Sequence, residues 1–307
     1  MHFYMKRLTA YVELLRPPLA AMDLAMPAAA ALLAVWAVES ALPPIMTFII
    51  AAIGAYCAIT SSYVYNDCCD IDVDRIGMPN RPLPSAQLSR KNAQLWSLIL
   101  FLVAALVSLY LNLESFVVLV IATIFISIYS SWAKRNTPFS WLFVGLSYGL
   151  VPLGVWLAFE PAGLLSAGPG LHPAAVILAA MICITDWGFT NCDASRDVAG
   201  DREKGIPTTP ATFGIAATAK IVTVFWIIGI ALSIALGLAA HLGWLYLSAA
   251  AVAGIWLLLQ NLDFMRHPTA KRGEELFYQS ANYRAVLFSA IIIDVLLQAG
   301  QLLWTGR

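Results

Sequence analysis

The sequence predicts an all-α protein that crosses a membrane many times, as a bundle of transmembrane helices with a cytoplasmic cap of connecting loops. Three observations support this prediction. The 307-residue chain is 60% hydrophobic and 12% charged, with a mean hydropathy of +0.77, whereas soluble domains carry roughly 25% charged residues. Apolar runs of about 20 residues, the length that spans a bilayer as a helix, recur along the whole chain. The basic residues gather on one side of these runs.

The predicted spans follow in chain order from the apolar runs between charged segments. The first run is too long for the core of a signal peptide and no convincing cleavage site follows it, so we expect it to be retained. The apolar stretch from Ile221 to Leu262 is too long for one helix, and the turn His241-Leu242-Gly243-Trp244 is expected to divide it. The nine predicted spans cover residues 17–38, 43–66, 92–111, 115–132, 139–159, 172–192, 217–239, 244–262 and 284–304.

The basic residues give an independent prediction of topology. If the N-terminus is cytoplasmic, 17 of the 18 basic residues lie on the cytoplasmic side, and only Arg307 falls outside. Such asymmetry is what the positive-inside rule describes. The 17 residues are Lys6, Arg7, Arg16, Arg75, Arg81, Arg90, Lys91, Lys134, Arg135, Arg196, Arg202, Lys204, Lys220, Arg266, Lys271, Arg272 and Arg284. We therefore expect an integral, multi-pass membrane protein (of the cell inner membrane if bacterial) whose N-terminus and active-site loops face the cytoplasm.

The same composition limits the partners. Eighteen Lys and Arg balance eighteen Asp and Glu, so no excess of positive charge indicates a nucleic-acid partner. The lipid bilayer is the expected environment, and nothing in the sequence points to an obligate protein partner. Residues 1–307 are expected to form a single domain.

The acidic residues gather in two clusters, each where a predicted span meets the cytoplasm. Four of the eighteen lie in the segment 66–74 (NDCCDIDVD), and another four lie between Asp193 and Glu203. Like charges repel one another, and carboxylates at membrane level are costly unless they are paired. The clusters therefore need a counter-charge, and a divalent cation is the usual one.

The spacing in the first cluster is helical. If the second span continues as a helix, Asn66, Asp70 and Asp74 stand at positions i, i+4 and i+8, so their side chains form one stripe. Asp67 borders that stripe, whereas Asp72 points elsewhere and is expected to be solvated.

The second cluster repeats this spacing with Asp193, Asp197 and Asp201. Oxygen ligands of this kind suit Mg²⁺, which keeps several waters and is commonly shared between carboxylates and substrate phosphates. A calcium-binding EF-hand loop starting at the first cluster is excluded, because Arg75 and Arg81 occupy the positions where that loop needs Gly and Glu.

At this point the motifs resemble those of a known family, the UbiA superfamily of intramembrane prenyltransferases. The first cluster matches its N-D-x-x-D-x-x-x-D pattern, and residues 80–85 (NRPLPS) match the segment that usually follows. Residues 197–205 (DVAGDREKG) resemble its D-x-x-G-D-R-x-x-G segment. Tyr129 with Lys134-Arg135 resembles its signature after span four, and Arg16-Pro17 its entry into span one. The details resemble the homogentisate, chlorophyll and archaeal-lipid branches more than the 4-hydroxybenzoate branch.

The resemblance implies a Mg²⁺-dependent enzyme that moves a prenyl group from an allylic polyprenyl diphosphate to an aromatic, quinone-precursor, tetrapyrrole or lipid acceptor and releases pyrophosphate. Arg81, Lys134 and Arg135 are candidates to bind the diphosphate. A dry, aromatic-lined cavity would protect the allylic cation. The implied metal ligands are Asn66, Asp67, Asp70, Asp74, Asp193, Asp197 and Asp201. The implied catalytic residues are Asp70, Asp74, Asp197, Asp201 and Asp186.

Three carboxylates lie inside predicted spans. Asp186 is a candidate to orient the acceptor or take its proton, because an ionisable residue inside a membrane is by default a functional hypothesis. Asp23 and Asp294 are expected to be buried hydrogen-bonding partners. Two alternative functions stay open at this point. A terpene cyclase on the same scaffold would need no acceptor, and a transporter would have only these three carboxylates near the midplane to use.

Overall fold

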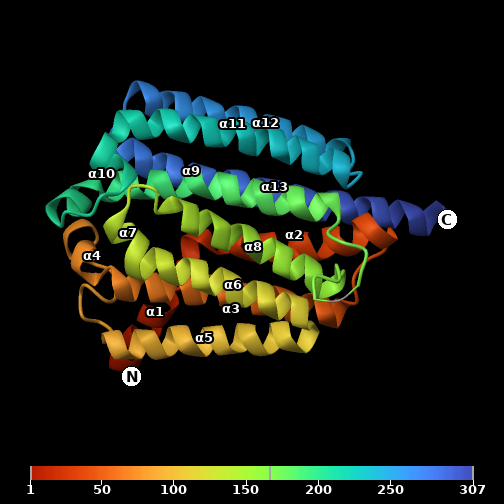
Figure 1. Cartoon of the computed structure of the whole chain (residues 1–307), viewed down its shortest axis with the longest axis horizontal. Coiled ribbons are helices and arrows are strands. Elements are labelled where there is room, and N and C mark those ends of the chain that lie inside the picture. The colour runs from red at the N-terminus through yellow and green to blue at the C-terminus, as the bar shows by residue number, and fades with distance from the viewer. Residues whose placement is uncertain (1, 166, 306–307) are drawn as a thin grey trace.

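The computed structural model of the chain describes residues 2–165 and 167–305, with side chains for 8–165 and 167–304. Arg307, the one basic residue predicted on the outer side, lies outside the described residues, as do the side chains of Lys6 and Arg7. All regular structure in the described part is helical. The long helices run side by side as a bundle of roughly parallel and antiparallel rods (Figure 1).

The helices follow one another with mostly short connections. They are α1 (His2–Glu13), the 3₁₀ turn η1 (Pro17–Leu19), α2 (Ala20–Glu39), α3 (Ile45–Cys69), α4 (Ile71–Gly77), α5 (Arg90–Leu111), α6 (Leu113–Ile128), the π-helical turn η2 (Tyr129–Ala133), α7 (Lys134–Asn136), α8 (Trp141–Phe159), α9 (Pro173–Glu203), α10 (Thr209–Phe213), α11 (Ile215–Ala239), α12 (Trp244–Arg266) and α13 (Ala270–Thr305).

The predicted number of spans is confirmed. Within residues 2–165 and 167–305, nine helices are long and apolar enough to cross a membrane. Most begin and end within a few residues of the predicted bounds. The two large differences are α9, which runs on to Glu203 instead of ending at residue 192, and α13, which begins at Ala270 instead of residue 284. In both cases a polar helical segment continues an apolar one, and apolar length alone does not reveal such an extension.

Arg284 was therefore placed wrongly by the sequence. It was assigned to a cytoplasmic connection, but it lies inside α13 and is buried. The start of α13 is marked by Thr269, whose hydroxyl oxygen accepts a hydrogen bond of 3.3 Å from the backbone N–H of Arg272. A Thr whose side chain caps the first turn is a recognised start signal for a helix, and it sets the beginning of α13 well before its apolar part.

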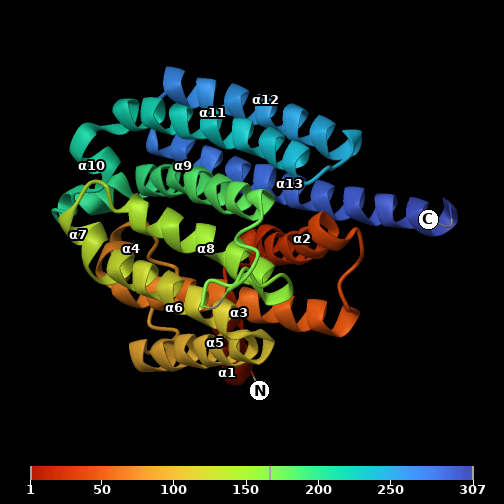
Figure 2. The same cartoon turned by 45° about the vertical axis from the view of Figure 1, so that its right-hand side comes forward.

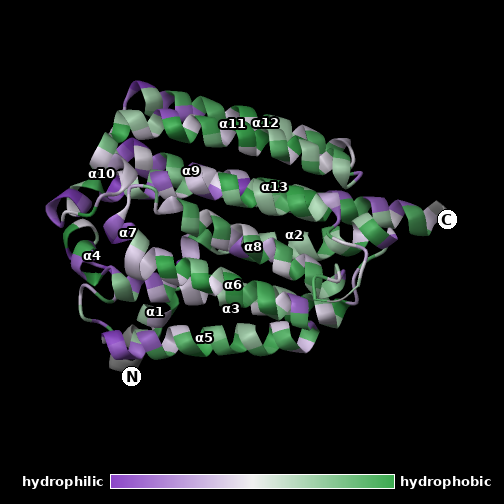
Figure 3. Cartoon of the chain, in the orientation of Figure 1, coloured by the Kyte–Doolittle hydropathy of each residue, from purple (hydrophilic) through white to green (hydrophobic). Residues whose placement is uncertain are grey.

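The long helices place the polar segments at one end. Figures 1 and 2 show the short helices α4, α7 and α10 gathered at the same end of the bundle, while the C-terminus lies at the other. Figure 3 shows hydrophilic residues concentrated at that end and a hydrophobic band along the rods. This arrangement is the predicted cap of connecting segments, and both acidic clusters belong to it.

The surface of the rods is apolar, as a lipid-facing surface must be. On α5, Leu98, Leu102 and Leu109 are 49–53% exposed, and on α12 Val252 and Leu259 are 67% and 57% exposed. Monomeric soluble proteins rarely show such extensive apolar surface. The interior is different: α2 is the most enclosed of the candidate spans among the described residues, and its small alanines let α3, α8 and α13 approach closely.

Candidate active site

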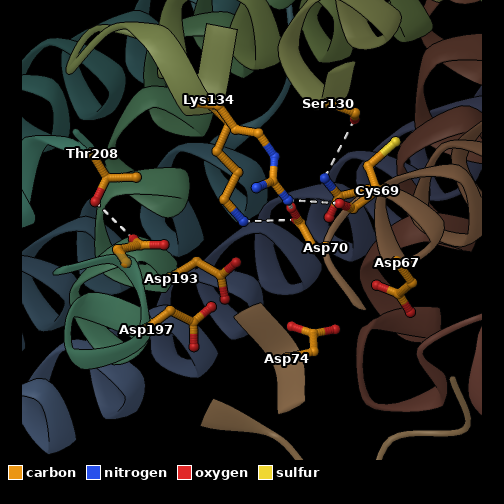
Figure 4. A network of polar contacts seen from close by, with 12 residues as sticks. Asp67, Cys69, Asp70, Asp74, Ser130, Lys134, Asp193, Asp197 and Thr208 are labelled. Atoms are coloured by element: carbon orange, nitrogen blue, oxygen red, sulfur yellow. Dashed lines mark hydrogen bonds and ion pairs between the residues drawn. The ribbon is translucent and has the colours of Figure 1, made fainter. Parts of the chain in front are cut away.

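The two acidic clusters meet at the polar end of the bundle. The first lies where α3 passes into α4, the second on the last three turns of α9, and α4 packs against α9. A third segment, η2 with α7, brings basic side chains to the same place. Figure 4 shows Lys134 extending between Asp70 on one side and Asp193 and Asp197 on the other.

The first cluster is not one continuous helix, so that part of the prediction is wrong. Asp70 has φ −106° and ψ 10°, which ends α3 and starts α4. The helical spacing nevertheless survives, because the N–H of Asp70 donates to the carbonyl of Asn66 at 3.0 Å and the N–H of Asp74 donates to the carbonyl of Asp70 at 2.9 Å. Asp67, Asp70 and Asp74 are 2–4% exposed. Asp72 points away, as expected, and its side chain is 47% exposed.

Each carboxylate of the first cluster is paired with a basic side chain. Lys134 Nζ lies 2.7 Å from Asp70 Oδ2, and Arg81 Nη1 lies 2.9 Å from Asp74 Oδ2. The predicted diphosphate-binding residues are therefore brought to the cluster, where they act as its counter-ions. Burial raises the pKa of Asp74 to about 6, although Arg81 opposes the shift.

Two arginines complete this set of counter-ions. Arg135 binds Asp72 through two nitrogens at 2.7 and 3.1 Å, which lowers the pKa of Asp72, and it lies 3.9 Å from Asp70 Oδ1. Arg16 lies 2.9 Å from Asp67 Oδ1. Arg16 was not among the site residues predicted from the sequence. The one signal for it was the resemblance of Arg16-Pro17 to the family's entry into span one.

The π-helical turn sets the position of Lys134. From Tyr129 to Ala133 the backbone widens to an i→i+5 pattern before α7 begins at Lys134. Such turns are rare and occur frequently at functional sites, because the extra residue changes the direction of the side chains that follow. Span four was predicted to end at residue 132, and this turn, which keeps Ala133 fully buried, is what carries the chain further.

The second cluster lies on an unbroken helix, as predicted. Asp193, Asp197 and Asp201 occupy successive turns of α9. Arg196, which the sequence did not single out, pairs with two of them: its Nη2 lies 2.7 Å from Asp193 Oδ1, and its Nε and Nη2 donate to Asp197 at 2.9 and 3.0 Å. The hydroxyl of Thr208 donates to Asp201 Oδ2 at 2.7 Å.

The donor atoms fit a hard cation shared with a ligand. A small hollow of about 20 Å³ is lined by carboxylates of the second cluster together with Tyr129 and Lys134. Asp70 Oδ1 and Asp201 Oδ1 are buried and accept no hydrogen bond. Among the described residues, no three His, Cys, Asp or Glu side chains form a ready-made metal cluster. Oxygen donors that supply one or two ligands each suit Mg²⁺, which takes its remaining ligands from water and phosphate.

The three intramembrane carboxylates have internal partners. Asp186 Oδ1 accepts a hydrogen bond of 3.0 Å from Arg284. Asp23 accepts hydrogen bonds from the hydroxyl of Tyr63 at 3.0 and 3.1 Å, and Asp294 accepts one of 2.6 Å from the N–H of Gly243 at the start of α12. Asp23 and Asp294 are thus the buried hydrogen-bonding residues that were expected.

Known proteins resemble this chain along most of its length. The chain is 26% identical over 265 residues to digeranylgeranylglyceryl phosphate synthase of Thermococcus sibiricus, covering 86% of this chain and 89% of that protein. It is 26% identical over 268 residues to protoheme IX farnesyltransferase of Cutibacterium acnes, covering 83% and 76%.

Solved structures show the same fold. An apo UbiA homologue from Aeropyrum pernix superposes with a TM-score of 0.70 at 20% identity, over 89% of this chain and 97% of that one. An Archaeoglobus fulgidus homologue bound to GPP and Mg²⁺ gives 0.58 at 18% identity, over 92% and 99%. A sequence model of the UbiA prenyltransferase family matches residues 24–287. With both acidic clusters inside the matched range, the chain belongs to the UbiA prenyltransferase family.

Proposed function

We propose that this membrane prenyltransferase moves the prenyl group of an allylic diphosphate to an acceptor taken from the bilayer, releases pyrophosphate and depends on Mg²⁺. The observation that carries the proposal is the meeting of two carboxylate clusters around Lys134. This ammonium group pairs with Asp70 and also lies within electrostatic range of Asp197 and Asp201. Lys134 is a cation that lies between two groups of carboxylates. This arrangement suits a diphosphate, because Mg²⁺ held by the carboxylates and the Lys134 ammonium group would both bind its phosphate oxygens.

The metal ligands are proposed from the same two clusters. Bound Mg²⁺ would neutralise the charge that develops on the departing pyrophosphate. The relative that binds GPP and Mg²⁺ supports this choice of ion. The proposed ligands are Asn66, Asp67, Asp70, Asp74, Asp193, Asp197 and Asp201.

The basic residues are proposed to exchange partners when the diphosphate binds. Without ligand, Arg81, Lys134 and Arg135 neutralise the first cluster. Phosphate oxygens offer these groups charge-assisted hydrogen bonds of the same kind as carboxylates do. The ion pairs thus hold these three basic side chains in position before the substrate arrives. When the diphosphate takes them over, Asp70 and Asp74 are free to bind metal.

The prenyl chain is proposed to lie in three adjoining hollows along α3, α5 and α6. The first, of about 330 Å³, is lined by Arg135 and Cys69 beside Asp70, and it shares Tyr65 and Gln94 with the second, of about 290 Å³. The second shares Ala58 with the third, which is walled by small and apolar residues and is narrow, at about 50 Å³. The lining changes from basic to polar to apolar, which matches a diphosphate followed by a hydrocarbon. Such a path keeps water from the allylic cation.

The acceptor and the membrane orientation are proposed from the relatives and from the positions of the basic residues. The relatives include enzymes named for a glyceryl phosphate and for protoheme, so a lipid or tetrapyrrole acceptor is proposed beside an aromatic one. The polar end, with the N-terminus and the site, is proposed to face the cytoplasm, because most basic residues of the sequence lie in the segments at that end.

Pyrophosphate release from purified protein in nanodiscs tests the proposal. Geranyl, farnesyl and geranylgeranyl diphosphates are each offered with and without Mg²⁺, to the wild type, Asp70→Ala and Asp197→Ala. Arg272→Lys, an exposed change on α13, is the matched control. Release that needs Mg²⁺, both aspartates and an added acceptor supports prenyl transfer. Release without acceptor, giving a hydrocarbon or terpene alcohol, would instead indicate a cyclase. Ion flux in liposomes with no release from any donor would favour a transporter.

A further inference from the structure

One guanidinium group in the middle of the bundle has hydrogen-bond partners for only part of its N–H donors. Arg284 of α13 is 3% exposed. Its Nη1 donates to Asp186 Oδ1 at 3.0 Å and lies 3.9 Å from Met22 Sδ. Its Nε and Nη2 are buried and have no hydrogen-bond partner. An arginine presents five N–H donors, and a buried charged group whose donors are unsatisfied is strongly unfavourable.

The two unused nitrogens form one edge of the guanidinium. Nε and Nη2 lie side by side and donate in parallel, which is the geometry that binds the two oxygens of a carboxylate or phosphate. The same chain provides an example: the Nε and Nη2 of Arg196 bind the two oxygens of Asp197 at 2.9 and 3.0 Å. In Arg284 the opposite edge is held by Asp186, so the two-nitrogen edge is fixed in place and free.

The surroundings would confine a ligand without competing for this edge. The ring of Phe189 lies 5.0 Å from the guanidinium carbon of Arg284. The nearby carboxylate of Asp23 is engaged through both oxygens by the hydroxyl of Tyr63. A second arginine, Arg16, lies 4.6 Å from the Tyr63 ring, and its buried Nε is also without a partner. The remaining carboxylate, Asp186, is neutralised by Arg284 itself and hydrogen-bonded by Thr190 at 3.3 Å.

This group lies beside the reaction site but deeper in the membrane. Thr190 lines the hollow at the second cluster. Asp186 precedes Asp193 by seven residues on the same helix, which corresponds to about 10 Å along the axis at 1.5 Å per residue. A ligand held at Arg284 would therefore extend toward the acidic clusters from below.

We propose that Arg284 binds an oxyanion of the acceptor, and that the acceptor enters with this acidic group first. The proposal rests on the prenyl transfer proposed above, because it names the chemistry of the second substrate. Arg284 lies deeper in the membrane than the acidic clusters, whereas the phosphate of a membrane lipid is held at the bilayer surface. The position of Arg284 therefore favours a small acceptor that carries a carboxylate. Arg284 is then a specificity-determining residue that distinguishes an acid from its neutral ester.

Binding is tested separately from turnover, by thermal stabilisation of purified protein in nanodiscs. The probes are 4-hydroxybenzoate and homogentisate, each beside its methyl ester, and protoheme IX and geranylgeranylglyceryl phosphate, each beside its dimethyl ester, so that every comparison is with a neutral ester. Arg284→Lys keeps the charge opposite Asp186 but removes the two-nitrogen edge. Arg272→Lys, exposed on the same helix, is the matched control. The double variant Asp186→Asn/Arg284→Gln, which leaves no buried charge, is used if Arg284→Lys does not fold.

At least one acid should stabilise the wild type and Arg272→Lys, its ester should not, and its apparent Kd should rise about tenfold or more in Arg284→Lys. The KM of the prenyl diphosphate should be unchanged. Equal binding of acid and ester, equal binding by Arg284→Lys, or no binding of any acid would overturn the inference and leave the free edge to water. Acid binding without pyrophosphate release would refute the proposed function while supporting this site.

Discussion

Replacing Lys134 by methionine should destabilise the ligand-free protein, and this loss should shrink when Asp70 is neutralised as well. The two groups are 2.7 Å apart, and their side chains are 12% and 3% exposed. Removing one partner of a buried ion pair leaves an uncompensated charge, at about 3–5 kcal/mol. Because Lys134 keeps some contact with solvent, we expect a loss of about 3 kcal/mol. In Asp70→Asn/Lys134→Met no orphaned charge remains, so much of the loss should disappear.

Unfolding in detergent of the wild type, both single variants and the double variant measures the coupling between the two residues. Groups in direct contact should couple by about 1 kcal/mol or more. Mg²⁺ supplies a second test, because a bound cation would replace the ammonium as the counter-charge of Asp70. Lys134→Met should therefore gain more stability from Mg²⁺ than the wild type does. Additive losses, or equal gains from Mg²⁺, would refute the idea that Lys134 and the metal share one carboxylate.

Three further predictions follow from named contacts. Asp197→Asn should lower Mg²⁺-dependent pyrophosphate release by about 100-fold or more, measured beside Asp263→Asn, an exposed acidic control; unchanged release would remove Asp197 from the site. Asp294→Ala should reduce the free energy of unfolding by about 1 kcal/mol, because the N–H of Gly243 loses its cap, while kcat/KM stays the same; a loss of activity at equal stability would contradict a structural role. Ala58→Phe should shift the preference toward shorter prenyl diphosphates, because Ala58 lines two of the three hollows; an unchanged ratio of geranyl to geranylgeranyl turnover would place the chain elsewhere.

The features that follow from local periodicity could be predicted from the sequence. Apolar length gives the nine spans within the described residues. The i, i+4, i+8 spacing of Asp193, Asp197 and Asp201 gives one face of α9, because an unbroken helix leaves no other geometry. The same reasoning predicted a continuous helix through Asp70, but the backbone leaves the helical conformation at that one residue. The i, i+4, i+8 spacing of Asn66, Asp70 and Asp74 is kept by two backbone hydrogen bonds.

The partners of the charged residues could not be predicted, because they depend on how distant helices pack. A buried position for Arg284 requires knowing that α13 starts at Ala270 and that α9 places Asp186 opposite. The pairing of Arg196 is different, because its partners Asp193 and Asp197, 2.7 and 2.9 Å away, lie on the same helix and the i, i+3 spacing already allowed the first of them. The sequence attributed the clustered carboxylates to a cation alone, whereas the chain's own basic residues supply much of the counter-charge.

The distribution of that counter-charge predicts which cluster binds metal first. In the first cluster, four carboxylates are matched by Arg16, Arg81, Lys134 and Arg135. In the second, the ion pairs of the described side chains join two of the three carboxylates, Asp193 and Asp197, to a single cation, Arg196, and leave Asp201 without one.

A divalent cation arriving without diphosphate should therefore bind at α9, where negative charge is in excess, and the first cluster should take metal only after a diphosphate has drawn its basic partners away. Asp201→Asn should weaken Mg²⁺ binding to the free protein, as measured by calorimetry. Asp74→Asn should matter only when pyrophosphate is present. If instead Asp74→Asn alone weakened Mg²⁺ binding to the free protein, the ion pairs of the first cluster would not prevent metal binding there, and the predicted order of binding would be refuted.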